Sequence, residues 1–248
     1  KNLQFRNLPF VIAMSLSGTT DTLRTHLTFE NLSFEWIEDA LRLYNSSNIT
    51  VKNCTAIRYT KRGFRVGDYC AFVSFTGCLA DCNAGDDNFP ARAIPAGFHV
   101  EPSPTHDISF VDCTSRNNRF KQSSTKNWNG DGFGSERGNS NITFLRCLAY
   151  DNHDAGFDNK ADNISYQDCV SVGNKDGFRH WCSNGQMFNC VAAFNVKAGG
   201  TGGSYGLWVS QNNGELTANF VTAHDNQSTQ VYAQPGGNAV ATINDSIL

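Results

Sequence analysis

The stretch ITFLRC at residues 142–147 returns as ISYQDC at residues 164–169, and both copies end on a cysteine. Further copies stand upstream and downstream: ISFVDC (108–113), ITVKNC (49–54), and the looser FVSFTGC (72–78) and MFNC (187–190). Self-similarity at a period of roughly 20–50 residues is typical of a solenoid, in which each repeat stacks on its neighbours. The sequence therefore predicts a repeat protein.

Each copy alternates apolar and polar side chains, and Asn, Asp or Gly follows it. Such short runs of β-branched and aromatic residues predict strands bounded by turns. No stretch keeps an apolar i, i+3, i+4, i+7 pattern over several turns, so helical and leucine-rich repeats fit badly. The pattern predicts an all-β fold, a right-handed parallel β-helix of about ten coils, each rising by ~4.8 Å.

Two positions of the repeat have a predicted structural role. The asparagine that closes each strand suits a left-handed turn conformation; these residues are Asn83, Asn117, Asn152, Asn174, Asn195 and Asn226. The repeat cysteines are expected to be free thiols in a buried column; they are Cys54, Cys78, Cys113, Cys147, Cys169 and Cys190. No C-x-x-C pair exists, which argues against a zinc site.

Composition limits the classes of partner. A net charge of −3 and a pI near 6.1 provide no basic surface for nucleic acid. No run of about eighteen apolar residues is present, so no membrane span is expected. Residues 1–11 read as a strand and not as a signal peptide. We expect one domain over residues 1–248, cut from a longer chain, because the ladder ends at 246–248 without a cover.

Acidic residues stand at matched offsets from a Gly-Phe pair in three successive copies: GDGF (130–133), DAGFD (154–158) and DGFR (176–179). If these copies stack in register, Asp131, Asp154 and Asp158 converge on adjacent coils. Arg179 then lies one coil further. Carboxylates so close repel one another unless a cation lies among them. Hard oxygen ligands suit Ca²⁺, and the sequence therefore predicts a calcium site.

Two long insertions, at residues 83–106 and 114–130, precede the acidic repeats. Long loops beside a rigid scaffold often carry function. The second insertion includes Arg119 and Trp128. A surface with an aromatic ring and several bases suits an extended anionic polymer, and an acidic polysaccharide is the natural candidate.

The acidic repeats resemble the family 9 polysaccharide lyases, the pectate lyase-like β-helix enzymes. The resemblance covers about residues 107–195 and is carried by DGF (131–133), DAGFD (154–158) and GFR (177–179). In that family the corresponding pattern is Asp-Gly-Phe, Asp-Asp-Gly-Trp-Asp and Gly-Phe-Lys; the aspartates bind Ca²⁺ and the lysine is taken as the base. The chain departs from the pattern twice, because Ala155 replaces one metal carboxylate and Arg179 replaces the lysine.

The resemblance implies Asp131, Asp154 and Asp158 as Ca²⁺ ligands and Arg179 at the place of the base. The implied reaction is β-elimination on a uronate polymer, with the metal acting as Lewis acid and template. Arg179 either takes the ring proton or clamps the substrate carboxylate. In the second case the proton goes to another base, for which the candidates are Lys160, Lys175 and His180.

The resemblance, the basic insertion and the composition together give the remaining expectations. The residues expected to bind substrate are Trp128, Arg119, Lys160 and His180. The partner is an acidic polysaccharide, without nucleic acid or membrane. The protein is expected to be a monomer that is secreted, extracellular or periplasmic.

Two other functions fit the same residues. A glycoside hydrolase needs two carboxylates about 5–9.5 Å apart, which Asp154 with Asp158, or Asp86 with Asp87, could supply. Against it, the chain has no His-containing polygalacturonase signature. A non-catalytic glycan-binding or tailspike-like module is the other alternative, since a fold does not determine a function and Ala155 could mark a degenerate lyase.

Overall fold

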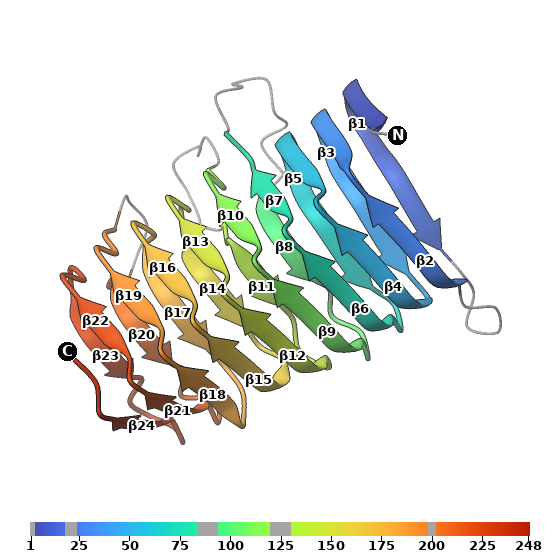
Figure 1. Cartoon of the computed structure of the whole chain (residues 1–248). Coiled ribbons are helices and arrows are strands. Elements are labelled where there is room, and N and C mark those ends of the chain that lie inside the picture. The colour runs from blue at the N-terminus through green and yellow to red at the C-terminus, as the bar shows by residue number, and fades with distance from the viewer. Residues whose placement is uncertain (1–2, 18–23, 84–93, 120–129, 198–201) are drawn as a thin grey trace.

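The computed structural model describes residues 3–17, 24–83, 94–119, 130–197 and 202–248. Every regular element in these ranges is a β-strand, and the strands stack in rows from the N-terminal to the C-terminal end (Figure 1). In this part of the chain there is no helix long and apolar enough to cross a membrane.

One sheet contains nine strands, and each strand pairs in parallel with the next strand of the same sheet, which belongs to the following coil. Its members are β2 (Arg24–Glu30), β4 (Ser46–Lys52), β6 (Ala71–Thr76), β9 (His106–Val111), β12 (Ser140–Leu145), β15 (Asp162–Gln167), β18 (Gly185–Phe188), β21 (Glu215–Asn219) and β24 (Val240–Asn244). The repeat ITFLRC (142–147) and its copies form strands of this sheet. Its Ile and aromatic positions are buried, as in Ile142 and Phe144.

The other sheet contains fifteen strands and divides into two series at the long strand β5 (Thr55–Gly67). The first half of β5 pairs with β7 and its second half with β8. The first series is β7 (Leu79–Asp81), β10 (Thr114–Arg116), β13 (Leu148–Tyr150), β16 (Val170–Val172), β19 (Val191–Ala193) and β22 (Thr222–His224).

The second series is β8 (Ala96–Val100), β11 (Phe133–Ser135), β14 (Ala155–Asn159), β17 (Asp176–His180), β20 (Tyr205–Val209) and β23 (Thr229–Ala233). Two more long strands, β1 (Leu3–Ser17) and β3 (Leu32–Tyr44), extend this sheet beyond β5. Each circuit of the chain therefore adds a strand to each of three rows, and all pairs are parallel. The prediction of an all-β parallel β-helix is confirmed.

Aromatic rings stack in two columns along the core. One column contains Phe64, Phe98, Phe133, Phe157 and Phe178, with neighbouring ring centroids 4.6–4.9 Å apart. The other contains Phe75, Phe110, Phe144 and Tyr166, with centroids 5.1–5.4 Å apart. Rings of the two columns meet edge to face, as Phe133 and Phe144 do at 5.7 Å. Such pairs contribute about 0.5–1.5 kcal/mol each beyond their buried area.

The cysteine column is present as predicted. All nine cysteines are free and buried. Several of the thiols donate to backbone carbonyls of an adjacent coil, as Cys147 does to the carbonyl of Phe110 at 3.4 Å. These weak donors are thereby satisfied without disulfide bonds.

The asparagine prediction is wrong for four of its six residues. Asn83 and Asn117 have a positive φ, but Asn152, Asn174, Asn195 and Asn226 do not. In those four coils the left-handed residue is the one before: Asp151, Gly173, Phe194 and Asp225. The asparagine itself points inward, and its amide hydrogen bonds to the same position on the next coil, as Asn152 does to Asn174 at 2.9 Å. Buried amides need such partners, so the side chains form a ladder that ties the coils together.

A glycine precedes each phenylalanine of the first column for a steric reason. A Cβ placed on Gly132 would lie 2.5 Å from the carbonyl oxygen of Gly156 and 3.1 Å from the Cβ of Ala149. Gly177 meets the equivalent atoms of Gly206 and Ala192. Only glycine therefore lets the strands of the second series approach this corner. The Gly-Phe pair therefore fixes how closely the strands next to the acidic residues approach the corner of each coil, and it fixes their register.

Truncating one ring of the stacked column should destabilise the whole rod. We expect Phe157→Ala to lower the free energy of unfolding by about 3–5 kcal/mol, because a fully buried ring leaves a cavity. The matched control is Phe188→Ala, whose ring is 48% exposed. Denaturant unfolding followed by circular dichroism measures both. Equal losses for the two variants would contradict the assignment of the column as the core.

Candidate active site

The acidic repeats stack in the register that their Gly-Phe pairs predict. Phe133 pairs with Phe157, and Phe157 pairs with Phe178. As a result Asp158 lies between Gly134 on β11 and Arg179 on β17. The second series of strands therefore brings together side chains that are more than twenty residues apart in sequence.

Arg179 occupies the centre of the cluster. Its guanidinium donates to both carboxylate oxygens of Asp154, at 3.1 and 2.8 Å, and to Oδ2 of Asp176 at 2.5 Å. Oδ1 of Asp158 lies 3.9 Å from Nη1. Burial opposes the charge of this group, but the three carboxylates outweigh burial and raise the pKa of Arg179 well above its ordinary value. Arg179 therefore stays protonated.

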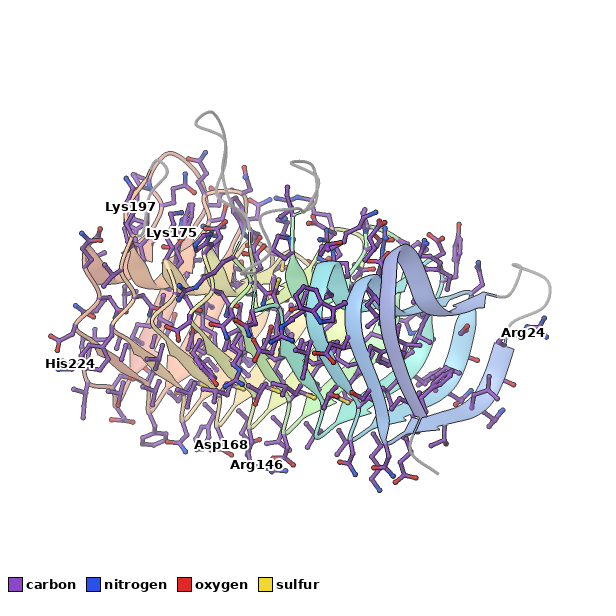
Figure 2. The ribbon with its side chains drawn as sticks, turned by 90° about the horizontal axis from the view of Figure 1, so that it is seen from above. Arg24, Arg146, Asp168, Lys175, Lys197 and His224 are labelled. Atoms are coloured by element: carbon purple, nitrogen blue, oxygen red, sulfur yellow. The ribbon has the colours of Figure 1, made fainter. Side chains whose placement is uncertain are left out.

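Two lysines flank the guanidinium. The Nζ of Lys175 lies 3.1 Å from Asp154 and 3.4 Å from Asp176. Figure 2 shows Lys175 on the side of the coil stack opposite Arg146 and Asp168. The Nζ of Lys160 donates to both carboxylate oxygens of Glu136, at 2.9 and 3.0 Å, and lies 3.5 Å from Asp158.

Burial disfavours the charge of Lys160, but Asp158 and Glu136 outweigh it and raise the pKa of this amine. The free base is correspondingly scarce at neutral pH. Lys160 is therefore better suited to hold a negative charge than to accept a proton.

Aromatic side chains cover the C-terminal side of the cluster. The ring of Trp208 lies 4.6 Å from the guanidinium carbon of Arg179, and Trp181 lies 6.0 Å from it. The indole N–H of Trp181 donates to Oδ1 of Asp158 at 2.5 Å. Cation–π contacts of this kind favour the charged guanidinium. They also limit the access of water to it, and the low local dielectric strengthens each ion pair.

The carboxylates of Asp131 and Asp154 have opposite pKa shifts. Burial, together with the charges of Asp158 and Asp154, raises the pKa of Asp131 well above its usual range. Burial acts on Asp154 in the same sense, but Arg179 and Lys175 outweigh it and lower the pKa of that carboxyl. The surroundings therefore favour the protonated form of Asp131 and the ionised form of Asp154. When the surroundings shift the pKa values of two neighbouring carboxyl groups in opposite directions, the group with the raised pKa is commonly assigned as the acid and the other as the base.

Asp131 differs from its neighbours in having no cation within 4.0 Å among the described residues. Its Oδ1 accepts a hydrogen bond from the backbone N–H of Ala155 at 3.0 Å. Asp131 is half-buried. Asp131 thus combines a raised pKa with the absence of an ion pair among the described residues.

Other predicted residues lie elsewhere. His180 is fully buried, both its ring nitrogens lack a hydrogen-bond partner, and burial lowers its pKa to about 4. It pairs with Asn159 and Val209, which face the interior. His180 is therefore a core residue in this structure. A Cβ on Gly185 would lie 2.5 Å from its ring, which shows how closely the backbone packs there.

Arg119 lies at the rim, outside the cluster. It is half exposed and reaches Asp151, with its Nε 3.2 Å from the backbone carbonyl of that residue. Trp128, Asp86 and Asp87 lie outside the described residues.

Two members of the site were missed in the sequence, although each carries the same signal. Asp176 stands two residues before Phe178, the offset of Asp131 from Phe133. His99 follows Phe98 as Asp158 follows Phe157, and it pairs with Gly134. Burial, then Arg62 and Arg65, lower the pKa of His99 well below its usual value, so the imidazole is neutral.

The donor set does not fit a calcium ion in this arrangement. Both oxygens of Asp154 already accept from Arg179. The guanidinium lies among the carboxylates that a divalent cation would need, and Ala155 contributes no ligand. No group of three or more His, Cys, Asp or Glu side chains suited to a metal occurs in the described part of the chain. Calcium assistance stays a prediction of the resemblance, and no step below uses it.

Comparisons with known proteins support the fold. No family model and no curated protein matches the chain. Among solved structures, a polygalacturonase from Erwinia carotovora ssp. carotovora is 10% identical, with a TM-score of 0.51 over 88% of this chain and 72% of that one. A rhamnogalacturonan lyase is 15% identical, with a TM-score of 0.54 over 86% and 65%. The Dettilon tailspike protein is 11% identical, with a TM-score of 0.40 over 98% and 61%.

The chain thus spans about two thirds of the rhamnogalacturonan lyase chain. Likeness at this level of identity concerns the fold alone, and it agrees with a parallel β-helix. Membership in the family 9 polysaccharide lyases stays a prediction.

Removing the central cation should leave buried carboxylates without a partner. We expect Arg179→Gln to lower the free energy of unfolding by about 3–5 kcal/mol at neutral pH. The lowered pKa of Asp154 contributes stability that is present above its unfolded value of about 3.9 and is lost as pH falls through the folded value. The difference in unfolding free energy between wild type and Arg179→Gln should therefore become smaller at acidic pH.

The control is Arg146→Gln, which removes an exposed ion pair with Asp112 on the opposite side of the molecule. It should change the unfolding free energy little at any pH. Denaturant unfolding at a series of pH values measures both. If the loss of unfolding free energy in Arg179→Gln does not change with pH, Arg179 stabilises the protein through packing and not through its ion pairs with the carboxylates.

Proposed function

We propose that the chain is a polysaccharide lyase that cleaves an acidic, uronate-containing polymer by β-elimination. The observation that carries the proposal is the placement of Asp131, which has a raised pKa and no cation within 4.0 Å among the described residues, beside carboxylates held by Arg179 and Lys175. This arrangement supplies a proton donor inside a cluster whose other charges are fixed. Two of the similar structures are named for enzymes of galacturonate and rhamnogalacturonan polymers, the substrate class proposed here.

Cations of the protein offset most of the carboxylate charge in the cluster. The carboxylates of Asp154, Asp158, Asp176 and Glu136 face three cations, Arg179, Lys175 and Lys160. Such a cluster does not repel an anionic polymer as four ionised aspartates would. The fixed cations thus supply the charge compensation that the resemblance assigns to calcium.

Elimination needs a group that protonates the departing glycosidic oxygen, and Asp131 can donate that proton. Arg179 is not suited to the role of base, because two carboxylates bind its guanidinium and its raised pKa retains the proton. Its contribution is to hold Asp154 and Asp176 in place. We therefore treat Arg179 as a positioning residue.

His99 is the residue of this surface that can take the ring proton. It is neutral, and it lies in the same row of the sheet as Asp158, with only Gly134 between them. A Cβ on Gly134 would lie 3.2 Å from Nδ1 of His99 and 3.7 Å from the carbonyl oxygen of Asp158. The ring of His99 thus packs against the face of Gly134, and the absence of a side chain there lets the imidazole lie in this row beside the acidic cluster.

Hydrolysis on the same site is the second candidate function. The observation that favours it is that the pKa of Asp131 is raised and that of Asp154 is lowered, because glycosidases require one protonated and one ionised carboxyl group. Against it, Asp154, Asp158 and Asp176 are each bound by cations, which weakens them as bases for water. The products separate the two reactions, since elimination leaves an unsaturated uronate that absorbs ultraviolet light and hydrolysis does not.

Asp131→Asn should abolish turnover without unfolding the protein. The raised pKa of Asp131 means that the unfolded chain releases this proton before the folded chain does, so wild-type stability falls as pH rises toward the folded value. Asparagine cannot ionise, and the variant should equal or exceed wild-type stability at neutral pH. Ultraviolet absorbance with polygalacturonate measures activity, and thermal unfolding measures stability.

Asp112→Asn, at an exposed carboxylate far from the site, should keep full activity. Undiminished turnover of Asp131→Asn would remove Asp131 from the chemistry. Reducing ends released by the wild type without ultraviolet absorbance would establish hydrolysis in place of elimination.

Chelation should leave the activity of the wild-type protein largely intact. The reason is that Arg179 already occupies the position among the carboxylates where a divalent cation would bind. The initial rate on polygalacturonate is measured in excess chelator and after calcium is added back. Complete loss in chelator with full recovery in calcium would contradict the proposed role of the protein cations and restore the metal to the mechanism.

A further inference from the structure

A row of aliphatic side chains fills the core behind the nine-stranded sheet, and one coil interrupts this row. The row pairs in register from coil to coil, and its buried members are Ile49, Val73, Ile108, Ile142, Ile164 and Leu216. Gly185 of β18 takes the same position between Ile164 and Leu216. In that coil the strand therefore supplies no side chain to the core.

The ring of His180 occupies the space that this glycine leaves. A Cβ on Gly185 would lie 2.5 Å from both Cε1 and Nε2 of the imidazole. The positions that pair with His180 on β14 and β20 hold smaller residues, Asn159 and Val209. In this one coil an imidazole thus takes the place of an aliphatic group in a close-packed interior.

The imidazole is enclosed among groups that do not offset a positive charge. His180 has no exposed surface, and among the described residues neither of its ring nitrogens makes a hydrogen bond. The amide of Asn159 is engaged elsewhere, because its Oδ1 accepts from Ser135 and its Nδ2 donates to Tyr166, each at 2.9 Å. Protonation would therefore place a charge in the core without a hydrogen bond to stabilise it.

The titratable groups around His180 compensate this cost only in part. Burial raises the pKa of Tyr166 and of Cys182, to about 12 for the thiol, so both groups are neutral. The exposed Asp162 and backbone groups of Cys182 and Glu215 favour the protonated imidazole. Burial outweighs them and lowers the pKa of His180 to about 4.

His180 lies on the strand that holds the charged cluster together. The residue before it, Arg179, binds Asp154 of the preceding coil and Asp176 of the same strand. Neighbouring residues of a strand point to opposite faces. A shift of the backbone that moves His180 out of the core therefore also moves the guanidinium that binds these carboxylates.

We propose that His180 is an acid-sensitive latch, which keeps the coil of β17 and β18 closed as long as its ring is neutral. A proton from solvent puts an unpaired charge in the core, and the coil relieves it by opening to water. Opening separates Arg179 from Asp154 on the neighbouring coil. The latch depends on how His180 and Gly185 pack, and it holds whichever reaction the site performs.

The lowered pKa of His180 sets the direction of the pH dependence. In the open or unfolded chain the imidazole has its ordinary pKa of about 6.5, so that state binds the proton first as pH falls. The stability that the neutral ring contributes is therefore complete above about pH 6.5 and is lost as pH falls toward about 4. Between pH 8 and pH 5 the equilibrium constant for opening should rise about thirtyfold through this residue.

Two variants remove the titration and keep the space filled. His180→Phe retains a ring, and the double variant His180→Asn with Gly185→Ile copies the preceding coil, in which Asn159 and Ile164 take these positions. The control is His224→Phe, at a histidine whose side chain is 62% exposed. Thermal unfolding at pH 8 checks that each variant is folded, and either folded variant is enough for the comparison.

Amide hydrogen exchange followed by mass spectrometry measures the opening of residues 176–188 at pH 8 and pH 5, after correction for the intrinsic exchange rate at each pH. Residues 46–59, which contain no histidine, are the internal reference. Comparing these two segments within the wild type requires no variant. Exchange through local opening reports the free energy of opening of each segment separately.

We expect opening of residues 176–188 in the wild type to increase about thirtyfold from pH 8 to pH 5, relative to residues 46–59. The increase should be retained in His224→Phe and lost in both variants at position 180. An equal increase in the wild type and in these variants would show that His180 only fills space. A rise of the same size in both segments of the wild type would likewise overturn the latch.

Discussion

In-register stacking of the Gly-Phe pair is the constraint on which the rest of this structure depends. Each phenylalanine lies on the ring of the coil before it, and each glycine lets the backbone approach a corner where a Cβ would collide. A shift of one residue would exchange buried and exposed positions along a strand. Because the register is fixed, residues at the same offset from Phe133, Phe157 and Phe178 must become neighbours. The site is a consequence of the core.

The site contains more charged side chains than a protein interior ordinarily tolerates. Ion pairs among these side chains stabilise them there. Arg179 binds Asp154 and Asp176 and lies near Asp158, while Lys175 adds a second contact to Asp154. Desolvated ions are stable only when such geometry satisfies them. The guanidinium thus neutralises carboxylate charge in the cluster, as a metal ion does when carboxylates coordinate it. Asp131 has no such partner among the described residues, and burial together with the charges of Asp158 and Asp154 raises its pKa and favours its protonated form.

The sequence allowed the fold and the composition of the cluster to be predicted, because both follow from periodicity. Strand period, repeat length and the offsets around Gly-Phe can be read from the sequence. When the coils stack, residues at the same offset in successive repeats become neighbours. The same reasoning extends to Asp176 and His99, whose offsets match those of Asp131 and Asp158. Those two residues could have been included with the information in the sequence alone.

What the sequence could not supply is the direction and pairing of individual side chains. His180 follows Arg179 directly, yet it faces the core, because neighbouring residues of a strand point to opposite faces. Asn152 and Asn174 were expected to adopt the left-handed turn, but the residue before each one does so and frees the amide for a buried ladder. Whether Arg179 would face a substrate or bind carboxylates depends on contacts between coils, and no pattern along the chain encodes that choice.

The protonation state of Asp131 is the central claim, and carbon-13 nuclear magnetic resonance of aspartate-labelled protein tests it most directly. Comparison with Asp131→Asn assigns the carboxyl signal of this residue, and a pH titration follows it. We expect this signal still to report a protonated carboxyl group at neutral pH, after the exposed aspartates have ionised. Ionisation of Asp131 within the ordinary carboxyl range would contradict its proposed role as the proton donor.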